Sequence, residues 1–163
     1  MRFHRSADMT AFLRRSVIQA SRSVRSTVMA EERVPLAGIQ AADDHLGRRV
    51  PLPSAPLPLA RWVEVVADGP GTVQVEWNLD DTRPGSPGRL ALCVSHKTPP
   101  ERGLGDATAL GRYAHRTAPL TQAESGLRPV HELAWQADGL HLRLTGQGPW
   151  ELDELVVLAD SVA

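Results

Sequence analysis

Apolar residues near the start of the chain recur with the period of an α-helix. Between residues 8 and 32 they come every three or four positions, and at 100° per residue they fall in one stripe. Asp8 or Ser6 can cap the start of this helix, and Val34-Pro35 ends it, because the residue before proline disfavours the helical conformation. The pattern predicts an amphipathic N-terminal helix whose stripe is Met9, Leu13, Val17, Ala20, Val24 and Val28.

The stretch at residues 50–58 reads Val-Pro-Leu-Pro-Ser-Ala-Pro-Leu-Pro, which is typical of a polyproline-like linker. We therefore expect three parts: an N-terminal helical segment at 1–49, the linker at 50–58, and a domain at 59–163. A short helix around Ala37–Leu46 fits within the first part.

Beyond the linker the period of the apolar residues changes from about 3.6 to 2. Residues 72–79 alternate strictly between apolar and polar side chains and form the clearest predicted strand. Arg61–Ala67 is a second strand. Arg89–Ser95 is a third, and because it is apolar on both faces we expect it at the centre of a sheet.

The last quarter of the chain predicts a hairpin and a closing helix. Asp138-Gly139 is a tight-turn signal between strands at Pro129–Gln136 and Leu140–Thr145. Residues 149–162 then predict a helix with the apolar face Leu152, Leu155, Val156 and Ala159, whereas residues 107–127 fit either a short helix or an edge strand.

These elements predict an α+β fold, with an antiparallel β-sheet, a helix packed on one face, and the amphipathic N-terminal helix before it. The four tryptophans are expected mainly to fill the core, although they could instead line a pocket for an apolar ligand. We expect one core that contains Val75, Trp77, Leu92, Trp135, Leu142 and Leu155.

The C-terminal pattern resembles a known bacterial family. The run Leu133–Gly146 combines a tryptophan strand, an Asp-Gly turn, an amphipathic strand and a glycine, and Leu152-Asp153-Glu154-Leu155 lies in the closing helix. This order resembles the lipoprotein-like sensor domains of some anti-sigma factors and related secreted proteins of unknown function. The resemblance implies an antiparallel sheet with a helix on one face, and it implies no catalytic residues.

Charge is distributed unevenly along a chain whose formal net charge is only −1. Residues 1–33 carry seven arginines against three acids, whereas residues 131–163 carry one arginine against six acids. The near-neutral total argues against a generally basic nucleic-acid binder, so no nucleic-acid partner is expected. The two ends of the chain are instead electrostatic complements.

The cationic N-terminal helix is the most specific candidate for an interaction site. One interpretation is that its stripe packs on the domain's own sheet with the arginines in water. The others are an acidic groove on a protein partner, an anionic membrane surface, or an organellar transit segment. The candidate residues are Leu13, Val17, Ala20 and Val24 on the stripe, with Arg14, Arg15, Arg22 and Arg25 on the opposite face.

Catalytic and cofactor motifs are weak throughout the sequence. None of the six histidines has zinc-ligand spacing, and the glycines at 103–105 fit neither a dinucleotide loop nor a phosphate loop. The adjacent acids Asp43-Asp44 and Asp80-Asp81 are expected in solvated loops. The single cysteine, Cys93, lies in an apolar run and is expected to be an inert, buried thiol. We predict no catalytic residue, no metal ligand and no cofactor.

The sequence thus predicts a non-enzymatic protein-interaction or regulatory module that docks or self-associates through its N-terminal helix. A protein partner or a homo-oligomer is expected, with a membrane surface as a lesser candidate. The first alternative is a carrier that holds an apolar ligand between sheet and helix, and the second is an enzyme with an unfamiliar site. No signal sequence or span of about 20 apolar residues is recognised, which predicts a cytoplasmic location.

Overall fold

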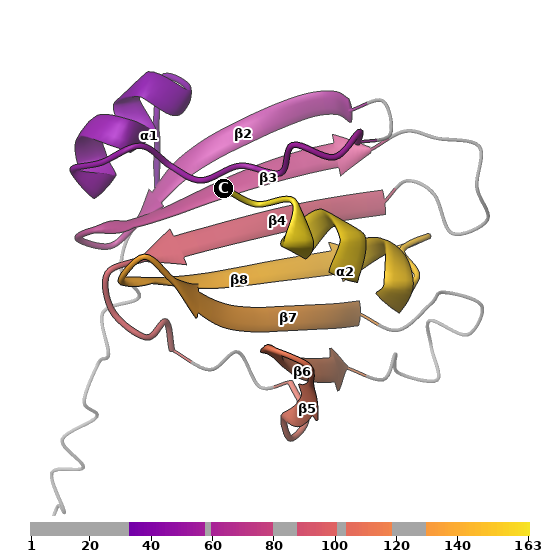
Figure 1. Ribbon diagram of the computed structural model, residues 1–163. Helices are drawn as coiled ribbons and strands as arrows, with labels where there is room; N and C mark the ends of the chain where they lie inside the picture. The colour runs from indigo at the N-terminus through magenta and orange to yellow at the C-terminus, as the bar shows by residue number, and fades with distance from the viewer. Residues whose placement is uncertain (1–32, 58–59, 80–87, 101–103, 119–129) are drawn as a thin grey trace, which may run out of the picture.

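The computed structural model describes residues 33–57, 60–79, 88–100, 104–118 and 130–163. Within them, eight strands form one antiparallel sheet accompanied by two α-helices (Figure 1). The antiparallel α+β class is confirmed, whereas the predicted N-terminal helix lies outside the described residues.

The described elements, in chain order, are one short strand, a helix, seven further strands and a closing helix. Their bounds are β1 (Arg33–Pro35), α1 (Ile39–Leu46), β2 (Ala60–Asp68), β3 (Thr72–Leu79), β4 (Gly88–Ser95), β5 (Thr108–Leu110), β6 (Tyr113–Ala118), β7 (Val130–Ala137), β8 (Leu140–Gln147) and α2 (Leu152–Asp160).

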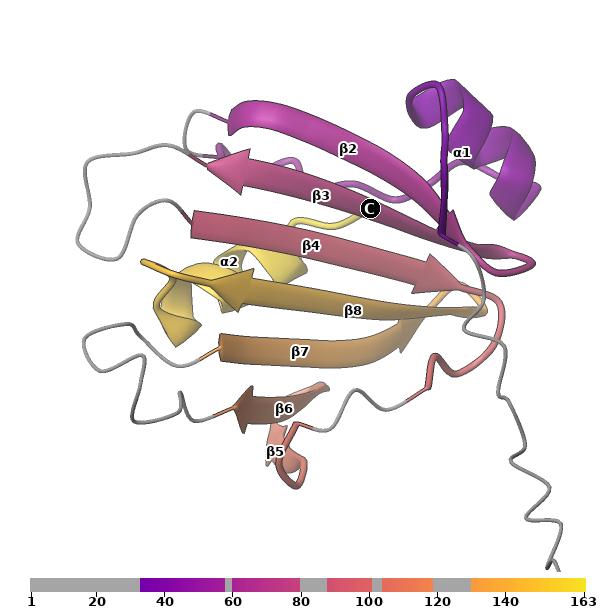
Figure 2. The ribbon, with the colours of Figure 1, turned by 180° about the vertical axis from the view of Figure 1, so that it is seen from behind.

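The strand order in the sheet is β1-β2-β3-β4-β8-β7-β6-β5. The first four strands follow chain order. The chain then passes the ends of β8 and β7 to the far edge and returns, so that β8 pairs with β4 (Figures 1 and 2). β4 therefore has a neighbour on each side, which confirms the central position expected for the apolar run at 89–95.

The hairpin between β7 and β8 forms at the expected Asp-Gly turn. Asp138 has φ 50° and Gly139 has φ 74°, and two successive positive φ angles are what a two-residue type I′ turn requires. The turn pairs Ala137 with Leu140 and Gln136 with His141. Its geometry thus sets the register of the whole hairpin.

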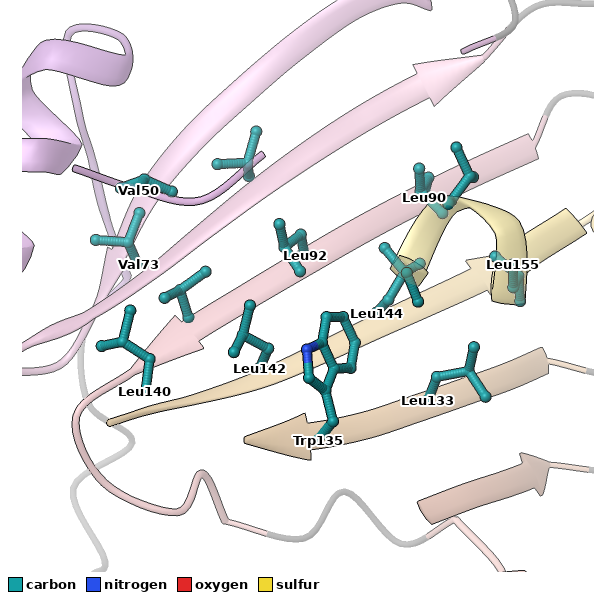
Figure 3. Packing of buried hydrophobic residues seen from close by; sticks show 14 of the residues in the cluster. Val50, Val73, Leu90, Leu92, Leu133, Trp135, Leu140, Leu142, Leu144 and Leu155 are labelled. Atoms are coloured by element: carbon teal, nitrogen blue, oxygen red, sulfur yellow. The ribbon is translucent and has the colours of Figure 1, made fainter. Parts of the chain in front are cut away.

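One face of the sheet carries the hydrophobic core. Leucines of β4, β7 and β8 project to this face together with Val73 of β3, and Leu155 of α2 packs over them (Figure 3). All six predicted core residues belong to the same buried cluster, which confirms that prediction: Val75, Trp77, Leu92, Trp135, Leu142 and Leu155. The alternation of apolar and polar residues along the strands was enough to predict these core residues, because helices cover only one face of the sheet.

Both helices cover this face. α1 contacts β2 and β3, and α2 contacts β7 and β8. Seen from behind, the second face of the sheet carries no helix of the described part of the chain (Figure 2). The two faces therefore differ in character: the core face is apolar, and the second face carries the buried polar residues Gln74, Glu76, Ser95, Glu132 and Arg143.

The proline-rich segment, which we expected to act as a linker, runs across the core face between the two helices (Figure 1). Val50 is buried in the main cluster, and Leu52, Ala55 and Leu57 pack against it. Pro53 forms a β-bridge with Val162 near the end of the chain. Residues 50–57 thus contribute to the core of the sheet domain.

Three further details differ from or refine the predictions. Of the stretch at 107–127 that fitted either a helix or a strand, the described part, 107–118, is mostly occupied by the strands β5 and β6. α2 starts at Leu152, three residues after Pro149. Trp62 is 48% exposed at the edge of the sheet, so it does not fill the core as Trp77, Trp135 and Trp150 do.

Candidate functional site

The interaction residues predicted from the sequence fall in the segment 1–32, outside the described residues. They are Leu13, Val17, Ala20, Val24, Arg14, Arg15, Arg22 and Arg25.

α2 combines a buried apolar face with an acidic outer face. Its first turn is closed by a capping box, in which Glu154 accepts a hydrogen bond from the backbone N–H of Glu151 at 2.9 Å. Leu155 and Leu158 point into the core. The outward side exposes acids together with one large apolar residue: Glu151, Asp153, Glu154 and Val157.

A groove of about 400 Å³ lies between α2 and the proline-rich segment. Residues 55–57 form one wall, and Trp150, Glu154, Val157 and Leu158 form the other. Val157 is 61% exposed, although Leu158 and Trp150 on the same wall are buried. The groove is therefore mainly apolar, with a carboxylate on the α2 side.

The two walls of this groove are fastened together at one end. The backbone N–H of Ser54 donates to the carbonyl of Ser161 at 3.1 Å, and the Ser54 hydroxyl donates to the same carbonyl at 3.0 Å. The N–H of Ala55 donates to the Ser161 hydroxyl at 3.1 Å. These contacts join residues more than one hundred positions apart, so the sequence pattern gave no signal for the groove.

A second group of polar residues surrounds Glu76 on the opposite face of the sheet. The Glu76 carboxylate accepts hydrogen bonds from Arg33, Gln74 and Arg89. Burial by itself raises the pKa of Glu76, but the two arginines outweigh it and leave the pKa below its ordinary value of 4.5. Glu76 is therefore held as an anion. A general acid must carry a proton, so this arrangement suits a structural role.

His115 and His131 form a third polar group, on the edge of the core face. Nε2 of His115 lies 3.1 Å from Nδ1 of His131, and the Thr117 hydroxyl lies 3.1 Å from the same His115 nitrogen. The register pairs His131 with Gly146 of β8 and with Thr117 of β6, which places it beside His115. The pair could not be foreseen because β6 was not assigned from the sequence.

Other candidates have structural partners. Asp43, one of the adjacent acids, lies in α1 and accepts a hydrogen bond from the Val50 N–H at 2.7 Å. Cys93 is buried, as predicted. Within the described ranges no group of three metal-binding side chains is present. No described helix is long and apolar enough to cross a membrane.

None of the protein-family models, curated proteins and solved structures compared with this chain matches it.

Proposed function

We propose that the protein is a non-enzymatic interaction module that self-associates through its cationic N-terminal segment. The observation that carries this proposal is the groove between residues 55–57 and α2, which is apolar and lies beside the acidic face of the helix. The sequence of the N-terminal segment predicts a complementary pattern, an apolar stripe with arginines on the opposite face of the helix. Amphipathic helices commonly bind a partner by laying their apolar face into a hydrophobic groove.

The pairing of the buried acids supports a binding role over a catalytic one. Glu76 lies between Arg33 and Arg89, and Glu132 lies 3.6 Å from both Arg116 and Arg143. The two arginines keep the pKa of Glu76 below its ordinary value, which suits a structural charge.

The occupant we propose is the N-terminal segment of a second copy of the chain. Residues 1–32 join the described fold at Arg33, which pairs with Asp68 at the last position of β2. The groove wall ends at Leu57, just before β2 starts at Ala60. At about 3.3 Å per residue, these points lie at opposite ends of a strand about 30 Å long. To reach the groove of its own chain, the N-terminal segment would have to cross this length. The segment of a second copy would not.

Apolar contact and charge play different parts in the proposed dimer. Covering Val157 and the neighbouring leucines removes apolar surface from water, at roughly 25 cal/mol per Å². The exposed acids of α2 attract the arginines over a longer range and mainly raise the association rate. High salt should therefore slow assembly more than it weakens the assembled dimer.

The test is the native mass of the full chain by light scattering at micromolar concentration. The unmodified chain should be a dimer, and Leu13→Asp with Val17→Asp should give a monomer. Val157→Asp in the groove should do the same, because a second charge would enter an apolar, already acidic site. Val34→Asp is the matched control, since Val34 is also exposed, at 51%, but lies on β1.

The proposal is wrong if the unmodified full chain is a monomer under these conditions. It is also wrong if the dimer survives both Leu13→Asp with Val17→Asp and Val157→Asp. A control variant that dissociates as readily as Val157→Asp would place the interface elsewhere.

A further inference from the structure

The second face of the sheet contains a pocket that the proposed dimer does not use. It has a volume of about 260 Å³ and lies over β6, β7 and β8. The connection after β4 forms its outer wall through Thr98, Pro99 and Leu104. The groove on α2 is on the opposite face, so the two features are independent.

The floor of the pocket is hollow because two small residues are neighbours. Ala114 of β6 pairs directly with Ala134 of β7, and both line the pocket. Directly opposed residues on one face have their Cβ atoms only about 5 Å apart, so long side chains there would fill the space. Together with Pro99 and Leu104, the alanines give the pocket an apolar half.

The other half of the pocket is charged. Arg116 and Arg143 flank Glu132, each with a nitrogen 3.6 Å from a carboxylate oxygen. Only 8% of the Arg143 side chain is exposed, and its Nη1 donates to the Pro100 carbonyl at 3.0 Å. This contact orients a buried guanidinium group at the pocket wall. The formal charges of the lining residues Arg116, Glu132 and Arg143 sum to +1.

We propose that this pocket binds a small carboxylate-bearing molecule with a compact apolar body. The carboxylate would lie against Arg143 and Arg116, because planar guanidinium groups match the geometry of a carboxylate. The apolar body would lie over Ala114 and Ala134. The pocket is smaller than the roughly 300–1,000 Å³ of sites for drug-sized ligands, which limits the ligand to one ring or a short chain.

An ion pair that only stabilised the sheet would not need the hollow beside it. A pair of larger residues in place of the two alanines would cover Arg143 and Glu132 equally well and bury more apolar surface. The combination of an empty apolar floor and an oriented, buried arginine is what a ligand site requires.

The test adds benzoate, phenylacetate or hexanoate to the full chain and measures binding through the amide chemical shifts of the protein. Acetate has the charge without the body, and benzyl alcohol has the body without the charge. At least one of the three carboxylates should bind saturably, with shifts near Ala134 and Arg143. Acetate and benzyl alcohol should each bind about tenfold more weakly or worse, because each keeps only one half of the contacts.

Ala134→Leu separates a ligand site from a structural ion pair, since it fills the hollow and keeps every charge. It should abolish binding of the carboxylate. Ala91→Leu is the matched control, because Ala91 lies on the same face of β4 but does not line the pocket. Thermal melting checks that both variants are folded. The proposal is overturned if none of the three carboxylates binds saturably, or if folded Ala134→Leu binds as well as the unmodified chain.

Discussion

His115 on β6 and His131 on β7 lie with their rings stacked, the ring centroids 5.4 Å apart and the planes inclined by 28°. Burial lowers the pKa of both imidazoles below the ordinary value of 6.5, and at His131 repulsion from His115 adds to the effect. The folded protein therefore resists protonation at this pair.

This relationship predicts a loss of stability in mild acid. The unfolded chain takes up these protons at higher pH than the folded protein, so the free energy of unfolding falls as the pH drops below about 6.5. Urea denaturation at about pH 7.5 and about pH 5.5 measures the loss. His131→Gln should make it smaller, whereas His141→Gln, on the other face of the sheet, should leave it unchanged. Equal losses in all three proteins would contradict the prediction.

The second prediction concerns the close approach of α2 to β8. A Cβ atom on Gly146 would lie 2.8 Å and 2.9 Å from the two methyl groups of Leu155 and 3.0 Å from Cβ of Trp150. Gly146→Ala should therefore destabilise the protein by about 1–3 kcal/mol through overpacking. Leu155→Ala alone should cost about 2–5 kcal/mol through the cavity it leaves.

The two changes should compensate in part, because Leu155→Ala creates the space that the new methyl group needs. The double variant should be more stable than the sum of the single losses predicts, by more than about 0.5 kcal/mol. Denaturant melts of the four proteins measure this coupling. Simple additivity would mean that α2 moves away from Gly146 at little cost.

A third prediction follows from the buried carboxylate of Glu76, which is 2% exposed. Arg89→Met should lower the free energy of unfolding by about 1–3 kcal/mol at neutral pH, because a buried anion loses one of its donors. Arg48→Met is the control: Arg48 also donates a hydrogen bond, to the Asp138 carbonyl at 2.8 Å, but it is exposed. Its replacement should cost within about 0.5 kcal/mol. Equal effects would show that Arg89 does not stabilise the charge of Glu76.

The same carboxylate predicts a second acid-sensitive step. Because the pKa of Glu76 in the folded protein lies below 4.5, its contribution to stability is present above that pH and is lost as the pH falls below it. Glu76→Gln should remove this step, and the slope of stability against pH below about 4.5 should become smaller. An unchanged slope would assign the acid sensitivity to other carboxylates.

The last prediction is that Cys93 reacts slowly with thiol reagents in the native protein. The side chain is buried on β4, and Arg143 is its directly paired residue on the neighbouring strand β8. An adjacent cation favours a reactive thiolate, but burial keeps the reagent out, so labelling should require opening of the sheet. A disulfide reagent measures the rate in native and denatured protein. Labelling of the native chain at the rate seen in denaturant would contradict the prediction.

Local structure was largely determined by the sequence alone. The alternation of Val73, Val75 and Trp77 defined a strand and its buried face, and Asp138-Gly139 defined the hairpin turn. Leu155 and Ala159 marked the buried side of the closing helix. Each of these signals depends on residues within a few positions of one another, where the side-chain period and the turn geometry act directly.

Only the tertiary structure decided which distant residues meet. The pairing of β4 with β8 depends on the strand order, which the alternation does not encode. His115 meets His131, and Ala114 meets Ala134, only because β6 lies beside β7. The groove exists because residues 53–55 bind the end of the chain at Ser161 and Val162. A periodic pattern shows which face of an element is buried, but it carries no information about the partner that covers that face.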